Sequence, residues 1–95
     1  MEEKKWFVYL IKCLDGTFYT GIALDLEKRI NAHKSGNGSK YIRAKGFDCL
    51  IGSRECSGKS QALKEELRIK KLKKEEKIVF FLRTHLRKPS SKKII

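Results

Sequence analysis

The chain has 95 residues, a length that suits one compact domain built around one hydrophobic core. Hydrophobic residues make up 40% of it and charged residues 36%, a globular composition that excludes a disordered chain. Its formal charge is +12, from 23 Lys and Arg against 11 Asp and Glu. Such a charge favours a polyanionic partner, and nucleic acid is the first candidate. The alternative is that the charge only keeps a small protein soluble.

The cysteines and the first residues predict a cytoplasmic protein. Cys13, Cys49 and Cys56 are odd in number and contain no CxxC pair, which fits a reducing compartment. The charged start is followed by no long apolar run, so we expect neither a signal peptide nor a membrane span.

Residues 6–13 and 17–22 predict two antiparallel strands joined by a tight turn at Gly16. A two-residue loop would place Tyr9 and Tyr19 on opposite faces of this hairpin. A three-residue loop, with Gly16 in the left-handed conformation, would place both tyrosines on one face. A site that uses both tyrosines therefore requires the three-residue loop.

In the three-residue register, Tyr9 lies beside Gly21, which we expect to leave open space for a substrate backbone. The face opposite the tyrosines is the expected core, formed by Trp6, Val8, Leu10, Phe18, Thr20 and Ile22.

Asp25 is a typical N-cap for a helix that extends to about Lys34. Arg29 and His33 are four residues apart in this helix and project along one strip of its surface. A mobile basic loop is expected after the helix, at 35–40.

The rest of the chain predicts a short helix at 41–45, a third strand at 47–56 and two helices, at 60–72 and 73–84. In the helix at 60–72, the residues expected to face inward are Ala62, Leu63, Glu66, Leu67 and Ile69. The expected fold is α+β: a small three-stranded antiparallel sheet flanked by helices, in the order β-β-α-α-β-α-α. We expect a single domain at 1–86 and a flexible basic tail at 87–95.

Five of these residues form a chemically consistent set for phosphodiester cleavage if the fold brings them together. The Glu66 carboxylate is a hard oxygen ligand suited to Mg²⁺ or Mn²⁺. Arg29 offers a planar guanidinium that matches phosphate oxygens, and His33 can relay a proton near neutral pH. A tyrosine base, Tyr9 or Tyr19, needs nearby positive charge because a phenol has a pKa of about 10.

The order and spacing of Tyr9, Tyr19, Arg29, His33 and Glu66 resemble the GIY-YIG nuclease superfamily, and more closely its small single-domain UPF0213/YhbQ-like branch. The resemblance implies metal-dependent cleavage of a nucleic-acid backbone, DNA in preference to RNA, with low sequence specificity and a role in DNA repair or processing. It implies that Tyr9 and Tyr19 are the motif tyrosines, one of which activates water. Arg29 would hold the phosphate, His33 would assist proton transfer, and Glu66, in preference to the adjacent Glu65, would bind one Mg²⁺ or Mn²⁺ ion.

Substrate binding is expected to rest on phosphate contacts, which position a nucleic acid without reading its sequence. A partner protein could supply specificity, and we expect a monomer or weak dimer. The residues expected to make the phosphate contacts are Lys34, Lys40, Arg43, Lys45, Lys70, Lys71 and Lys73.

Two alternatives stay open. The first is a nucleic-acid-binding module without turnover, since relatives carry an asparagine after the metal-binding glutamate and no asparagine follows Glu66. The second is a zinc-stabilised interaction domain that uses Cys49, Cys56 and a histidine, although the spacing of these cysteines suits no common zinc site.

Overall fold

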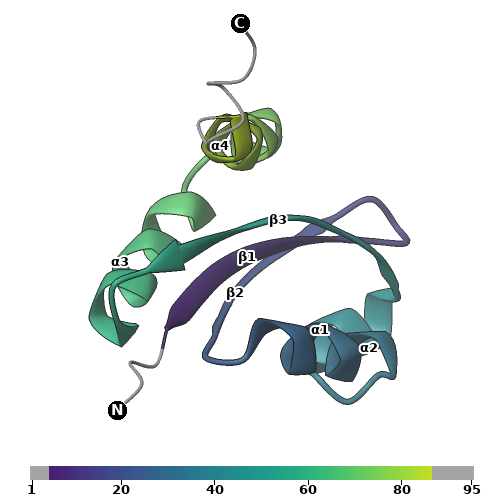
Figure 1. Ribbon diagram of the computed structural model, residues 1–95. Coiled ribbons are helices and arrows are strands. Elements are labelled where there is room, and N and C mark those ends of the chain that lie inside the picture. Colours follow the sequence, from purple (N-terminus) through teal and green to yellow (C-terminus); the bar gives the residue numbers. More distant parts are fainter. Residues whose placement is uncertain (1–4, 87–95) are drawn as a thin grey trace, which may run out of the picture.

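The computed structural model describes residues 5–86 as a three-stranded antiparallel sheet with helices on both faces (Figure 1). The strand order is β2-β1-β3, so β1 is central and antiparallel to both neighbours. This confirms the predicted α+β class and element order, while the predicted tail at 87–95 lies outside the described residues. Within residues 5–86, no helix has both the length and the apolar stretch needed to cross a bilayer. The elements are β1 (Trp6–Cys13), β2 (Phe18–Ala23), α1 (Leu26–Lys34), α2 (Lys40–Lys45), β3 (Phe47–Cys56), α3 (Lys59–Lys70) and α4 (Lys74–Leu86).

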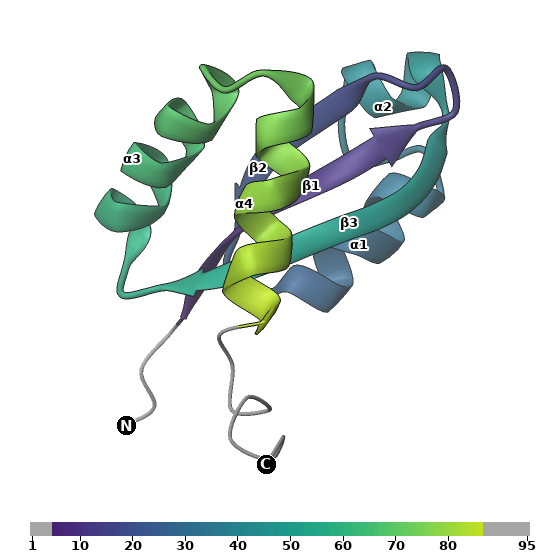
Figure 2. The ribbon, with the colours of Figure 1, turned by 90° about the horizontal axis from the view of Figure 1, so that it is seen from above.

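The sheet lies between two apolar layers, so its central strand β1 is buried on both faces (Figures 1 and 2). The layer under α3 and α4 contains Val8, Leu10, Cys56, Ala62, Ile69 and Phe81, with Trp6, Phe18 and Ile22 packed against it. The layer under α1 and α2 contains Tyr9, Ile11, Cys13, Ala23, Ile30 and Ile42, with Tyr19 packed against it. The strand face predicted as core therefore lies against α3 and α4, and the tyrosine face lies against α1 and α2.

The turn between β1 and β2 is the three-residue loop that the shared tyrosine face requires. Gly16 has φ 87°, and the side chains of Tyr9 and Tyr19 therefore lie on the same face of the sheet. The Asp15 carboxylate accepts hydrogen bonds from the Thr17 N–H at 3.0 Å and the Thr17 hydroxyl at 2.6 Å. These bonds from Thr17 lower the pKa of Asp15 to about 2. Local turn chemistry thus sets the register of the hairpin.

Helix α1 begins as predicted, because the Asp25 carboxylate accepts a hydrogen bond from the Lys28 N–H at 3.1 Å. Two residues of this helix, Ile30 and His33, are buried against the sheet. The cap therefore fixes where along the sheet His33 arrives.

Helix α3 differs from expectation in two ways. It begins at Lys59, one residue before the predicted start at Ser60, after Gly58, which makes no side-chain cap. Leu63 and Leu67, predicted to face inward, are 42% and 60% exposed. Only the side of the helix that carries Ala62 and Ile69 is fully buried, because α3 meets the sheet along a narrow strip.

Candidate active site

The centre of the candidate site is a buried pair formed by Tyr9 on β1 and His33 on α1. Tyr9 is 0% exposed and His33 is 1% exposed. The Tyr9 hydroxyl oxygen lies 2.8 Å from Nε2 of His33, and the ring centroids are 5.7 Å apart. Residues far apart in the sequence therefore share one hydrogen bond inside the layer between the sheet and α1.

Two glycines lie against this pair, and neither has room for a side chain of its own. A Cβ atom at Gly21 would lie 2.6 Å from the Tyr9 hydroxyl and 3.0 Å from Cε2 of Tyr19. A Cβ atom at Gly38 would collide with the His33 ring, 2.7 Å from its Cε1. The expectation that Gly21 leaves open space for a substrate is therefore wrong, because the Tyr9 hydroxyl occupies that space. Gly38 was not predicted as part of the site, since it looks like an ordinary residue of a Gly/Ser/Asn-rich loop.

Tyr19 and Arg29 form the accessible side of the site. The half-buried Tyr19 ring has its centroid 6.3 Å from that of Tyr9 and 5.5 Å from that of His33. Arg29 is exposed on α1 and, with Trp6, lines an open hollow of about 350 Å³. A phosphate that approaches from solvent would meet Tyr19 and Arg29 before the buried pair.

The electrostatics of the buried pair favour two neutral groups at rest. Burial raises the pKa of Tyr9, and the nearby Arg29 guanidinium partly opposes this effect. Burial also lowers the pKa of His33, and the positive charge of Arg29 lowers it further. At neutral pH the imidazole is therefore uncharged and able to accept a proton.

The structure distinguishes Glu66 from its neighbour Glu65. The Glu65 carboxylate lies 3.5 Å from Arg68 and 4.0 Å from Arg54 on β3. Glu66 instead faces Lys70, with 3.4 Å between Oε2 and Nζ, and its charge raises the pKa of Tyr9. Of these two carboxylates, Glu66 is therefore the one whose charge acts on Tyr9.

The donor set around Glu66 fits an ion that keeps most of its water. Within residues 5–86, no group of three or more His, Cys, Asp or Glu side chains could enclose a metal. Mg²⁺ commonly binds through one or two carboxylates together with substrate phosphates and water, rather than in an all-protein cage. The half-buried Glu66 carboxylate, 18% exposed, suits this arrangement.

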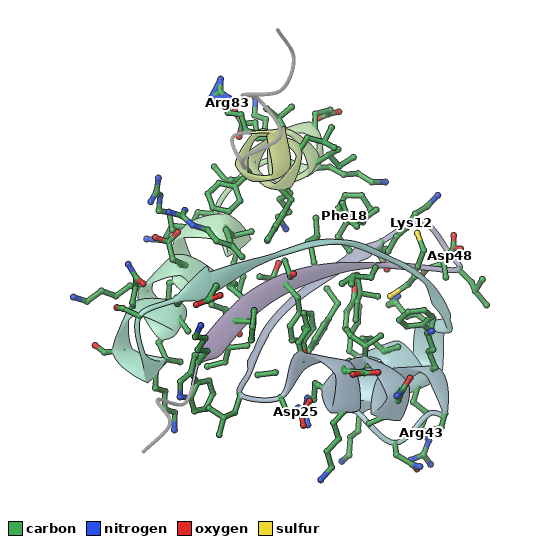
Figure 3. The ribbon with its side chains drawn as sticks, in the orientation of Figure 1. Lys12, Phe18, Asp25, Arg43, Asp48 and Arg83 are labelled. Carbon is green, nitrogen blue, oxygen red and sulfur yellow. The ribbon has the colours of Figure 1, made fainter. Side chains whose placement is uncertain are left out.

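The residues predicted to bind phosphate come from several elements, and some of them have partners within the protein. Lys70 adjoins Glu66, whereas Lys34 is near the Phe47 ring of β3, 5.9 Å from its centroid. Lys45 forms an ion pair with Asp15 at 3.1 Å. Arg43 projects from α2 away from the sheet (Figure 3). The remaining three are exposed: Lys40, Lys71 and Lys73.

The cysteines predicted as zinc ligands in the second alternative lie at different places on β3. Cys49 is exposed and pairs with Lys12, while Cys56 is buried and pairs with Trp6 at the other end of β1. Burial raises the pKa of the Cys56 thiol, which disfavours the thiolate that a metal requires. The described part of the chain therefore does not assemble the proposed zinc site.

Comparisons with known proteins agree with this geometry. Residues 5–78 match the profile of the GIY-YIG catalytic domain. The chain is 46% identical to a UPF0213 protein of Cronobacter sakazakii, over 81% of this chain and 79% of that protein. It is 44% identical to the UPF0213 protein YhbQ of Escherichia coli, over 76% of this chain and 72% of that protein.

A solved structure shows the same fold. The solution NMR structure of the protein EF2693 from E. faecalis superimposes with a TM-score of 0.62 at 34% identity, covering 90% of this chain and 92% of that one. The matched profile spans most of the chain and includes Tyr9, Tyr19, Arg29, His33 and Glu66. The chain therefore belongs to the GIY-YIG catalytic domain family, and within it to the UPF0213 proteins.

Proposed function

We propose that this protein hydrolyses phosphodiester bonds of nucleic acid, DNA in preference to RNA, in a reaction that depends on Mg²⁺ or Mn²⁺. The observation that carries the proposal is the 2.8 Å contact between the Tyr9 hydroxyl and His33, next to Arg29 and coupled to Glu66. A buried tyrosine with a neutral imidazole at hydrogen-bond distance has a destination for its proton. Membership of the GIY-YIG family supports a nuclease reaction.

Tyr9 is the better candidate for water activation. With the His33 proton on Nδ1, Nε2 accepts the proton of the Tyr9 hydroxyl while the Tyr9 oxygen takes a proton from water. The water oxygen then forms a bond to phosphorus, the bond from phosphorus to the leaving sugar oxygen breaks, and that oxygen takes up a proton from solvent while His33 later returns its proton to solvent. Tyr19 lies closer to solvent and would orient the phosphate or the attacking water.

The charge around Tyr9 and His33 must change before the proton passes from Tyr9 to His33, because burial opposes ionisation of both side chains. Arg29 would bind phosphate oxygens through its guanidinium while it favours the Tyr9 phenolate. Glu66 would hold the metal ion, which when bound supplies positive charge to the phosphate and the leaving oxygen.

The basic surface supports a substrate contacted through its backbone. The net charge of +12 attracts nucleic acid over a distance, and lysine contacts to phosphates carry no direct sequence information. We therefore propose low sequence specificity, with the shape of the substrate, or a partner protein, directing the enzyme to damaged or branched DNA.

Cleavage assays with a matched pair of variants test the proposal. Single strands, duplexes, flaps and forks of DNA, and their RNA counterparts, are incubated with and without Mg²⁺ or Mn²⁺. We expect Glu66→Gln to lower the cleavage rate about a hundredfold or more, as when one preorganised electrostatic group is removed. Glu65→Gln is the control: it removes the same charge one residue away, where Arg54 and Arg68 bind it, and should leave cleavage unchanged.

Salt-sensitive binding without cleavage of any substrate would show that the protein is a binding module. An equal loss of cleavage in the two variants would contradict the proposal that Glu66 is the specific metal ligand.

A further inference from the structure

A hollow of about 240 Å³ lies across β2, which has no further strand beside it in the described sheet. We call it the β2-edge pocket. It adjoins the candidate active site, because Tyr19 and Lys70 belong to both: the Tyr19 ring is 5.5 Å from that of His33, and Lys70 pairs with Glu66. Its lining comes from β2, α2, α3 and α4 and consists of Phe18, Tyr19, Thr20, Tyr41, Lys70 and Lys77.

One wall of the pocket presents aromatic rings. Tyr41 is 39% exposed on α2, and its ring centroid lies 5.7 Å from that of Tyr19, with 34° between the ring planes. Phe18 is not part of this wall, because it lies on the side of the sheet that faces α4, where the lysines of the pocket also lie (Figure 3). Exposed aromatic faces beside a basic surface are the platforms on which proteins stack unpaired bases.

On the face of β2 that carries Phe18, the pocket is lined by a residue with an unpaired polar atom. Thr20 is 4% exposed, and its hydroxyl oxygen has no hydrogen-bond partner in the described part of the chain. Buried polar atoms are almost always paired, so an unpaired hydroxyl beside a hollow is a candidate to pair with a ligand once the side chains that cover it move. A hydroxyl both donates and accepts, and can therefore bind the edge of any base.

The other wall is cationic. Lys70 on α3 and Lys77 on α4 face the pocket from the side opposite α2. Aromatic rings on one side and ammonium groups on the other match a nucleotide, which has a flat base and an anionic phosphate.

We propose that the β2-edge pocket binds one unpaired nucleobase of the substrate, next to the phosphate that is cleaved. The identity of the substrate rests on the proposed function. The pocket is smaller than the roughly 300–1,000 Å³ of sites for drug-sized ligands, so it suits one base and not a base pair. A base inside a duplex cannot enter such a pocket unless it leaves the stack, so the pocket selects substrates that have an unpaired nucleotide at this position.

The test compares binding of two oligonucleotides in EDTA, so that no cleavage occurs. One is single-stranded oligothymidylate, and the other has the same length and phosphates but abasic sugars throughout. Tyr41→Ala should weaken binding of oligothymidylate about five- to hundredfold, the effect of removing one stacking partner, and should leave the abasic strand unaffected. Tyr41→Phe keeps the ring and should bind both strands like the wild-type protein.

Two further variants separate base contacts from phosphate contacts. Thr20→Val keeps the side-chain shape without the hydroxyl, and should weaken binding of oligothymidylate only. Lys77→Ala should weaken both strands equally, because phosphates are common to them. Lys64→Ala removes the same charge from the exposed surface of α3, outside the pocket, and should weaken binding less than Lys77→Ala does.

Two results would refute the proposal that this pocket binds a base. The first is a Tyr41→Ala protein that binds oligothymidylate like the wild-type protein. The second is a Tyr41→Ala protein that loses as much affinity for the abasic strand as for oligothymidylate. The binding result is independent of turnover. Base-dependent binding through Tyr41 without cleavage would refute the hydrolysis while supporting the pocket. Cleavage that depends on Glu66 but not on Tyr41 or on an unpaired base would support the hydrolysis and refute the pocket.

Discussion

Replacing Gly21 with alanine tests whether the close contact between the hairpin and Tyr9 is essential to the site. The added Cβ would lie 2.6 Å from the Tyr9 hydroxyl oxygen, 2.7 Å from Cζ and 3.0 Å from Cε2 of Tyr19. Gly21 is not among the described glycines with positive φ, so alanine is compatible with the backbone at this position. Space is therefore the only obstacle, and the Tyr9 ring has to move away from residue 21, which disturbs its hydrogen bond with His33.

The expected loss of stability is the sum of two destabilising effects and one stabilising effect. Overpacking costs about 1–3 kcal/mol, and loss of the buried hydrogen bond adds about 1 kcal/mol. Alanine recovers roughly 0.5–1 kcal/mol because it restricts the unfolded chain more than glycine does. The net loss is about 1–3 kcal/mol, which leaves a typical domain folded. Cleavage should fall about a hundredfold, since a displacement of about 1 Å at a reacting group has this effect.

Gly52→Ala is the matched control, because its Cβ would lie 2.8 Å from Cβ of Phe81, on the opposite face of the sheet from the tyrosines. Urea unfolding should show a similar loss of stability in both variants, while only Gly21→Ala should lose cleavage and show a displaced His33 imidazole signal in NMR spectra. Normal cleavage by folded Gly21→Ala protein would refute this reasoning. An equal loss of cleavage in Gly52→Ala would show that the effect is one of general stability.

Three further predictions concern the charges of the site. Arg29→Gln should raise the pKa of His33 in an NMR titration while leaving it below about 6.5, because the burial that mainly lowers this pKa remains; an unchanged or lower pKa would contradict the assigned cause. In urea titrations, the wild-type protein should lose stability relative to His33→Gln as the pH falls below about 6.5, because the unfolded chain takes up the proton on His33 before the folded chain does. A constant difference between the two proteins across that pH would count against a buried neutral imidazole. Lys70→Met should tighten Mn²⁺ binding by up to about fivefold in EPR titrations, because Lys70 competes with the metal for Glu66. Lys71→Met is its control, and an equal gain in that variant would show only an effect of net charge.

Local signals in the sequence predict the elements that carry the site. The Asp15-Gly16 turn and the Asp25 cap act over a few residues, and both appear in the structure as expected. Arg29 and His33 lie one helical turn apart as predicted, but the structure leaves Arg29 exposed and buries His33. The shared face of the two tyrosines follows from the odd length of the loop, since side chains alternate along a strand.

The packing of α3 could not be predicted in the same way. Helical periodicity gives the angles between side chains but not the rotation of the helix against the sheet. Leu63 and Leu67 were therefore expected inside and are exposed. The rotation of α3 brings Glu65 next to Arg54 of β3, whereas Glu66 pairs with Lys70 within the helix. Helical periodicity and the family resemblance both favour Glu66 over Glu65 for the site.

By itself, the sequence determined the strands, the helices and the types of residue available for the chemistry, because turns, caps and alternation depend on neighbouring residues. Only the tertiary structure decided which groups meet: the Tyr9 hydroxyl fills the space beside Gly21 and contacts His33, and Gly38 closes over the imidazole. The β2-edge pocket also exists only in the folded chain, because Tyr41 and Lys77 lie on helices α2 and α4, which cover opposite faces of the sheet (Figure 1). Such contacts depend on the distances between packed elements, which no local pattern in the chain specifies.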